Sequence, residues 1–261
     1  MRLPRRLEPQ HWKYASPSEP GWHRVVSPEN SPCRSLWFFR LNLAAGQGHQ
    51  LVDNSLELSA VVISGRVRLE AAGCVSWLNR LDSFYLPAAC PASLACEEPA
   101  VLYFGGGLYE GIGEFYTRSF DLSLPLGEIH QIHGHPPMRR EVFMTCNPEV
   151  AASRIMTGLS WSDPGGWSSW PPHQHEEHLE EAYFYFDMDG PHFGLHLSYL
   201  KPGRIDAVHV VQSGDCVISP RGYQTNVAPP GFRNSYFWLS AAHSHASRRF
   251  TGVAVNDPHY G

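Results

Sequence analysis

Short runs of alternating apolar and polar residues recur along the whole chain, and this pattern limits the fold more than any other feature. Side chains alternate between the two faces of a β-strand, so each run predicts a strand with one buried face. Residues 35–43 and 58–63 are examples, and residues 67–70 follow after a Ser-Gly pair, which predicts a hairpin. Only residues 147–152 suggest a helix, and a short one. The chain is therefore predicted to be all-β.

The two halves of the chain show the same order of signals, which indicates an internal duplication. In the first half a strand opens at Glu57, and an Asp, four residues and a Pro follow at 82–87. In the second half a strand opens at Glu181, and the same spacing recurs at 215–220. In each half, an Asp in a turn leads into a short apolar strand, and a Pro ends that strand. We therefore expect two β-sandwiches.

The length of 261 residues fits two modest domains, and the 43% of apolar residues is enough for their cores. We place an N-terminal domain at residues 1–130 and a C-terminal domain at residues 131–261. The polar stretch at 127–137, which is rich in Gly, Pro and His, is the expected connection.

Charge and targeting signals favour a cytoplasmic protein. The formal net charge of −5 gives no reason to expect binding to nucleic acid or to a membrane. Arg2, Arg5 and Arg6 precede a polar segment and not the apolar run of a secretory signal, and no stretch approaches the ~18 apolar residues of a membrane span. The six cysteines contain no CxxC pair, which favours reduced thiols. A small molecule is the expected partner.

The segment 165–186 carries the residues with the clearest chemistry. It contains His173 and His175, an HxH pair that follows two prolines. In extended chain the side-chain period is two, so both imidazoles project from one face of a strand. One interpretation is a metal site, and the alternative is that the two histidines cap a turn after Pro171 and Pro172.

Four glutamates follow the HxH pair, and parity separates them. Glu176 and Glu177 lie in the expected turn and face water. On the next strand Glu181 shares a face with two tyrosines, whereas Glu180 shares a face with phenylalanines. A polar interior favours Glu181 as the carboxylate beside the imidazoles. Two imidazoles and a carboxylate suit Zn, Mn, Fe, Co or Ni.

These residues resemble the two motifs of the cupin superfamily. The first motif is a Gly, an HxH pair, a Glu and a second Gly, and the second is Gly214, five residues and then Pro-Arg-Gly. Within the cupins, the chain resembles the 5-deoxyglucuronate isomerase family of inositol catabolism at residues 165–175, 179–183 and 220–223. Residues 181–188 also resemble the related 5-keto-4-deoxyuronate isomerases of pectin breakdown.

The resemblance implies two tandem cupin domains, each a double-stranded β-helix or jelly roll, with metal only in the C-terminal one. Zinc is the leading metal, with Mn, Fe, Co and Ni as others. The N-terminal half agrees, because it has Glu57 but only the single His49 before it. That half is then a metal-free scaffold. Bicupins of this kind often pair through their sheets, which leaves room for a homo-oligomer.

One position departs from the family pattern. The family follows Pro-Arg-Gly-Tyr with a histidine that supplies the last metal ligand, and this chain has Gln224 there. A glutamine oxygen can ligate a metal, but a neutral amide is a poorer donor than imidazole for zinc. Gln224 is therefore a ligand, a position left to water, or a sign of weakened metal binding. His209 is a conceivable substitute.

The activity implied by the resemblance is a metal-dependent aldose–ketose isomerisation of a deoxy uronic acid. A metal would polarise the carbonyl, and an acid and a base must move a proton through an enediol. Glu180, Tyr183 and Tyr185 are the candidates for proton transfer. Arg221 is either the partner of the substrate carboxylate or part of a surface ion pair.

Two other functions remain open at this level. Two histidines and a carboxylate are also the ligands of non-haem iron dioxygenases. A non-catalytic sugar-binding cupin would explain Gln224. The remaining histidines that stand near the motifs or in the connection are expected on the surface, and the two tryptophans of the first motif are expected to pack. These residues are His130, His133, His135, His243 and His245, with Trp167 and Trp170.

Overall fold

The computed structural model describes residues 7–260, and within that range the fold is built from β-strands. The helices of the described chain are two single 3-10 turns, η1 (Pro9–His11) and η2 (His245–Ser247). None of the described residues belongs to a helix long and apolar enough to cross a membrane. Arg2, Arg5 and Arg6, on which the absence of a secretory signal was argued, lie outside the described residues.

The first sandwich consists of a six-stranded and a four-stranded antiparallel sheet. The six-stranded sheet has the order β11 (Tyr116–Arg118), β8 (Ser83–Leu86), β5 (Leu56–Ser64), β10 (Ala100–Leu108), β3 (Trp37–Leu43) and β2 (Gly21–Val26). The four-stranded sheet has the order β4 (Gly48–Leu51), β9 (Ala92–Ala95), β6 (Val67–Ala71) and β7 (Cys74–Leu78). The hairpin predicted after residue 63 is not formed, because β5 and β6 belong to different sheets and the turn between them carries the chain across the sandwich.

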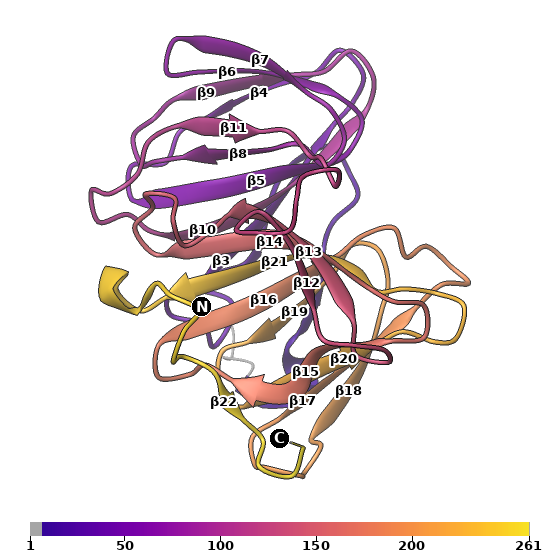
Figure 1. The fold of residues 1–261 in the computed structure, drawn as a ribbon. Helices are drawn as coiled ribbons and strands as arrows, with labels where there is room; N and C mark the ends of the chain where they lie inside the picture. Colours follow the sequence, from indigo (N-terminus) through magenta and orange to yellow (C-terminus); the bar gives the residue numbers. More distant parts are fainter. Residues whose placement is uncertain (1–6, 261) are drawn as a thin grey trace.

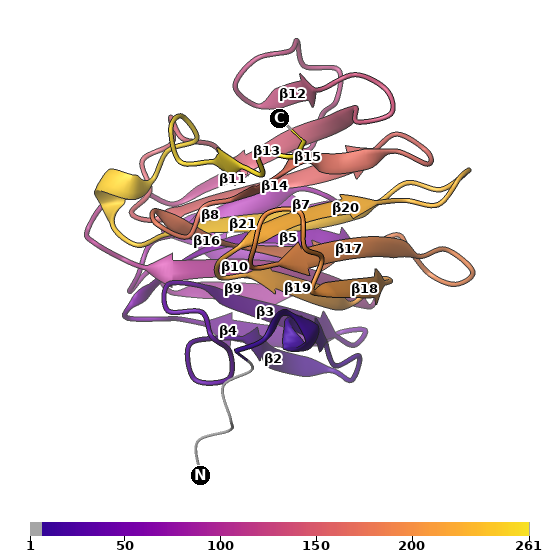
Figure 2. The ribbon, with the colours of Figure 1, turned by 90° about the horizontal axis from the view of Figure 1, so that it is seen from below.

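The second sandwich consists of a seven-stranded and a five-stranded sheet. The seven-stranded sheet has the order β1 (Lys13–Ala15), β19 (Asp215–Ser219), β16 (Leu179–Tyr185), β21 (Ser235–Ala242), β14 (Ile155–Ser162), β13 (Arg140–Cys146) and β12 (His130–His133). The five-stranded sheet has the order β18 (Ala207–Val211), β17 (Gly194–Tyr199), β20 (Tyr223–Val227), β15 (Trp167–Gln174) and β22 (Val255–Asn256). Figure 2 shows β17, β18 and β20 lying over the larger sheet with nearly aligned strands.

The two larger sheets pack against each other, so the molecule has four layers of sheet (Figure 1). The largest buried cluster of the fold lies between them and takes side chains from both sandwiches. Phe38 and Tyr103 from the first meet Phe184 and Phe237 from the second, and the rings of Tyr103 and Phe184 stack with centroids 3.6 Å apart. The hydrophobic contact between the halves is therefore as much a core as the interior of either sandwich.

The first strand of the chain belongs to the second sandwich. β1 pairs with β19, with Tyr14 opposite Cys216. β12 begins at His130 and pairs with β13 in the same sheet, while β11 still pairs with β8 of the first sandwich. The proposed boundary between residues 130 and 131 falls at the start of β12 and stays a prediction.

Glu57 has its structural counterpart in Glu180 and not, as the repeated spacing suggested, in Glu181. Each is the second residue of its strand, β5 or β16, and each faces the opposite sandwich. Glu57 accepts hydrogen bonds from the amides of Ser153 (2.7 Å) and Ile155 (2.9 Å), just before and at the start of β14. Glu180 accepts one from the amide of Ser35 (2.8 Å), just before β3. Each sandwich therefore contributes one carboxylate that accepts hydrogen bonds from the backbone of the other sandwich. We call these two reciprocal contacts of Glu57 and Glu180 the clasp.

The helix expected at residues 147–152 is not formed. A single turn stands there, closed by a hydrogen bond from the amide of Val150 to the carbonyl of Asn147 (3.1 Å). The prediction was wrong because one turn fixes several dihedral angles for a single hydrogen bond and does not propagate unless further turns follow. Here β14 begins at Ile155.

Candidate metal centre

The HxH pair lies at the end of β15, where both imidazoles project into the second sandwich. The rings of His173 and His175 are 4.9 Å apart between centroids. β15 pairs with β20, with His173 opposite Gln224, so the HxH pair and the glutamine of the second motif meet by strand pairing. The extended chain places the two imidazoles on one face, as the period of two predicted, and strand pairing brings Gln224 beside them.

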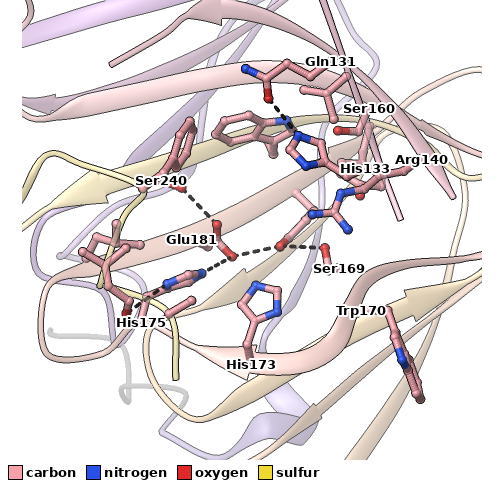
Figure 3. A pocket seen from close by; sticks show the side chains of 18 of the residues that line it. Gln131, His133, Arg140, Ser160, Ser169, Trp170, His173, His175, Glu181 and Ser240 are labelled. Atoms are coloured by element: carbon pink, nitrogen blue, oxygen red, sulfur yellow. Dashed lines mark hydrogen bonds and ion pairs between the residues drawn. The ribbon is translucent and has the colours of Figure 1, made fainter. Parts of the chain in front are cut away.

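Glu181 reaches the two histidines from the facing sheet (Figure 3). The Oε2 atom of Glu181 is 3.6 Å from Nε2 of His175. One ligand atom each from His173, His175 and Glu181 lie within 4.8 Å of one another. Glu181 also accepts hydrogen bonds from Tyr183 (2.9 Å) and Ser240 (3.0 Å), which hold its orientation. The three side chains are the predicted donor set.

Backbone carbonyls orient both imidazoles toward this set. Nδ1 of His173 is 2.8 Å from the carbonyl oxygen of Pro171, and Nδ1 of His175 is 3.3 Å from that of Val253. A carbonyl oxygen can only accept, so each Nδ1 carries the proton and each Nε2 keeps its lone pair. Metal-binding histidines are commonly held by such a second hydrogen bond.

The charge states match those that a divalent cation needs. Burial, together with the adjacent His175, lowers the pKa of His173 to about 4, so its imidazole is neutral at pH 7. Burial alone would raise the pKa of Glu181, but the histidines and the hydrogen bonds from Tyr183 and Ser240 outweigh it and lower that pKa. The site thus presents neutral imidazole and ionised carboxylate, the forms that coordinate metal.

Gln224 faces the same point, but with its amide nitrogen. Its Nε2 donates to the hydroxyl of Tyr183 (2.6 Å) and to Oε2 of Glu181 (3.1 Å), and lies 3.4 Å from Nε2 of His173. Its Oε1 is buried without a hydrogen-bond partner among the described residues. Such an orphaned acceptor is a group that a cation can satisfy if the amide rotates. Together with the donor set, it makes the site fit a divalent metal.

The residues predicted to act on the substrate lie in different parts of the structure. Tyr183 lines the cavity beside Glu181. Tyr185 lies deeper, completely buried, with its hydroxyl 2.8 Å from Nδ1 of His196. His209, the conceivable substitute ligand, lies outside the group and neighbours His196, with ring centroids 6.5 Å apart.

Glu180 and Arg221 do not lie in the site. The carboxylate of Glu180 points to the opposite face of β16 and binds the amides of Arg34 and Ser35, so its assignment to proton transfer is corrected. Its face is the one shared with phenylalanines, as parity implied. Arg221 is exposed, and its guanidinium donates to the carbonyl of Leu7 (3.1 Å). Its assignment to the substrate carboxylate is corrected too.

The donor set opens into a cavity of about 350 Å³ between the two sheets of the second sandwich. This volume suits a ligand of the size of a sugar. Among the lining residues that sequence reasoning missed are Arg140 of β13 and His133 of β12, because His133 lies in the stretch taken as the connection and no strand was predicted at Arg140. Trp170, expected only to pack, packs on Tyr260 and also lines the cavity.

The other histidines differ in burial. His130 is buried, against the expectation of a surface position, with its two ring nitrogens 2.8 Å from the carbonyl of Leu124 and 2.9 Å from Glu141. His133 and His135 are exposed, His133 at the rim of the cavity. His243 is half-buried, with Nδ1 2.9 Å from the hydroxyl of Ser35, whereas His245 is exposed as expected, with Nδ1 2.8 Å from the carbonyl oxygen of Ser153.

Comparison with known proteins places both fold and site in context. The model of the KduI/IolB family matches residues 12–258. A 5-deoxy-glucuronate isomerase of Geobacillus kaustophilus (strain HTA426) is 27% identical and covers 92% of this chain and 90% of its own.

Solved structures show the same architecture. An IolB-like protein of Salmonella typhimurium LT2 matches with a TM-score of 0.82 at 22% identity, over 96% of this chain and 98% of its own. An oxalate decarboxylase of Lactobacillus farciminis matches with a TM-score of 0.64 at 14% identity, over 94% and 88%. The predicted all-β fold of two tandem cupin domains is thereby confirmed.

Proposed function

This chain belongs to the KduI/IolB family, and from that membership we propose that it is a metal-dependent aldose–ketose isomerase of a deoxy uronic acid. Its curated relatives make it an isomerase. The proposed substrate is 5-deoxyglucuronate, an intermediate of inositol catabolism, because the relatives that match over most of the chain carry that name.

One observation carries the proposal. His173, His175 and Glu181 converge within 4.8 Å at the base of a cavity large enough for a sugar. A cation held there would act as a Lewis acid on the substrate carbonyl and the adjacent hydroxyl. Zinc is the first metal to test, because two imidazoles and a carboxylate are among its usual ligands, with Mn, Fe, Co and Ni next.

Tyr183 is the residue that we propose to hold a proton at a substrate oxygen. Burial, reinforced by the charge of Glu181, raises its pKa well above the ordinary value for tyrosine, so its hydroxyl stays protonated at pH 7. That hydroxyl accepts from Gln224 and donates to Glu181, and Ser169 lies 3.2 Å away. A protonated hydroxyl in this position acts as a donor and acid and not as the base.

The proposal is tested with 5-deoxyglucuronate and 5-keto-4-deoxyuronate as substrates. The metal-free protein receives Zn, Mn, Fe, Co or Ni one at a time. We expect turnover of 5-deoxyglucuronate that requires a metal and is lost in His175→Ala. The matched control is His135→Ala, since His135 is exposed and outside the cavity lining.

Three results would contradict the proposal. Preference for 5-keto-4-deoxyuronate would indicate the activity of the related 5-keto-4-deoxyuronate isomerases. Consumption of oxygen with Fe(II) would indicate a dioxygenase. Turnover of neither substrate with any metal would indicate a non-catalytic sugar-binding cupin, the alternative that Gln224 supports.

A further inference from the structure

Arg140 projects into the cavity from β13, the strand next to β14 in the large sheet of the second sandwich. Figure 3 shows its guanidinium group beside Ser169, with Glu181 between it and His175 in that view. It lines the same cavity as the donor set, and its positive charge is close enough to help lower the pKa of His173. A fixed cation therefore faces the space that a substrate would fill.

The neighbours of Arg140 are neutralised, but Arg140 is not. Arg139 forms an ion pair with Asp163 (2.7 Å), and Glu141 pairs with His130 (2.9 Å). Over residues 7–260, no carboxylate forms an ion pair with the Arg140 side chain and no hydrogen bond from it is found. A half-buried charge without a partner is unfavourable, so an anion from outside would be stabilised here.

The carboxylate in the cavity lining already has hydrogen-bond partners. Glu181 is the one acidic residue among the described residues of the cavity lining. Its two oxygens take hydrogen bonds from Tyr183, Ser240 and Gln224 and face His175. The cavity thus contains a cation without an ion-pair partner as well as the metal-binding groups, which suits a ligand that carries both an anion and a carbonyl.

We propose that Arg140 binds the carboxylate of the sugar acid and so sets the end of the substrate that faces His173, His175 and Glu181. The inference rests on the proposed function and adds the residue that selects uronic acids over neutral sugars. A planar guanidinium can bind a carboxylate through two parallel hydrogen bonds, which fixes orientation as well as charge. Arg140 replaces Arg221, the residue chosen from sequence, in this role.

The first test measures binding without turnover. The metal-loaded protein is titrated with D-glucuronate and with D-glucose in a calorimeter. We expect Arg140→Ala to weaken glucuronate binding roughly 10- to 100-fold, the range for loss of a charge-assisted hydrogen bond. Glucose binding is expected to stay unchanged, and Arg140→Lys to lie between Arg140→Ala and the parent. Arg221→Ala, the matched control, is expected to bind like the parent.

The second test separates positioning from chemistry. With the deoxy uronate as substrate, Arg140→Ala is expected to raise KM by a similar factor while the metal content stays at the parental level. Arg140→Gln keeps the bulk of the side chain if the alanine variant folds poorly. Equal glucuronate affinity in the parent, Arg140→Ala and Arg140→Gln would overturn the inference, as would a loss confined to Arg221→Ala.

The two proposals fail in different ways. If glucuronate binding depends on Arg140 but neither uronate is isomerised, the carboxylate site stands and the proposed function falls. If 5-deoxyglucuronate is isomerised with the same KM by the parent and by Arg140→Ala, the function stands and the carboxylate site falls.

Discussion

Gln224 lies against the three donor groups as a hydrogen-bond donor, in the place where the family pattern has an imidazole. Its Nε2 supports Tyr183 and Glu181, while its Oε1 has no hydrogen-bond partner among the described residues. The orientation of this one amide therefore decides between two roles. Gln224 is either a fourth protein ligand through Oε1, or it orients Glu181 by a hydrogen bond without contacting a metal. Its role as a ligand stays a prediction.

At the residue scale, we expect Gln224→His to raise metal affinity and His173→Ala to abolish measurable binding. An imidazole is a better donor than an amide for zinc, whereas loss of His173 leaves two of the three ligands. Elemental analysis and titration with a metal-sensitive dye measure both. If both variants hold as much metal as the parent, Gln224 and His173 do not share a metal site.

At the scale of elements, paired strands place the important groups. β15 and β20 bring His173 opposite Gln224, and β16 and β21 bring Glu181 opposite Ser240. The same alternation turns Glu180 to the other face, where it joins the clasp formed with Glu57. One strand therefore supplies a ligand on one face and a structural carboxylate on the other.

Loss of either contact of the clasp should destabilise the fold. Glu57→Ala and Glu180→Ala each leave buried amides without an acceptor, so we expect each to lower the free energy of unfolding by about 2–4 kcal/mol. Glu57→Gln and Glu180→Gln keep an acceptor and should lose less. Glu70→Ala, at an exposed position of β6, is the control and should change the free energy of unfolding by about 0.5 kcal/mol or less. Urea denaturation measures all five, and equal stability of the clasp variants and the control would contradict the role.

The hairpin of β12 and β13, which carries His133 and Arg140, should respond to pH through His130. The carbonyl of Leu124, and then the carboxylate of Glu141, raise the pKa of His130 against the opposing effect of burial. A raised folded-state pKa gives stability that is complete below the ordinary value of about 6.5 and is lost as pH rises through the folded-state value.

We therefore expect His130→Asn to destabilise the protein more at pH 5.5 than at pH 8.5. Thermal melts of the parent and the variant at both pH values measure this. A difference in stability that is the same at both, or larger at pH 8.5, would show that His130 does not gain a proton on folding.

At the scale of the whole molecule, the two sandwiches share one core. Phe184 lies between Tyr103 and Phe38 at the contact of the two large sheets, and β1 carries the start of the chain into the second sandwich. The N-terminal sandwich is therefore part of the support of β16, the strand that bears Glu181. We infer that the halves unfold together.

Phe184→Ala should test this coupling. Removal of a buried phenylalanine ring lowers the free energy of unfolding by about 3–5 kcal/mol. We expect a single transition, at lower denaturant, with circular dichroism and tryptophan fluorescence in agreement. Val75→Ala, at a position 54% exposed, is the control. Two separate transitions in the Phe184 variant would mean that the halves are independent.

The sequence by itself determined the class of fold and the donor set. Strand alternation is local, so a period of two is enough to place His173 with His175 and to choose Glu181 over Glu180. The motif spacing carried the family resemblance in the same way. These features could be predicted because they depend only on residues a few positions apart.

Only the tertiary structure decided the rest of the site. Arg140 and His133 reach the cavity because β13 and β12 extend the large sheet beyond β14, and no local pattern encodes which strands face one another across a sandwich. The exclusion of Arg221 and the reciprocal clasp of Glu57 and Glu180 depend likewise on contacts between distant segments. Hydrophobic burial of one sandwich on the other sets those contacts, and burial is a property of the whole chain.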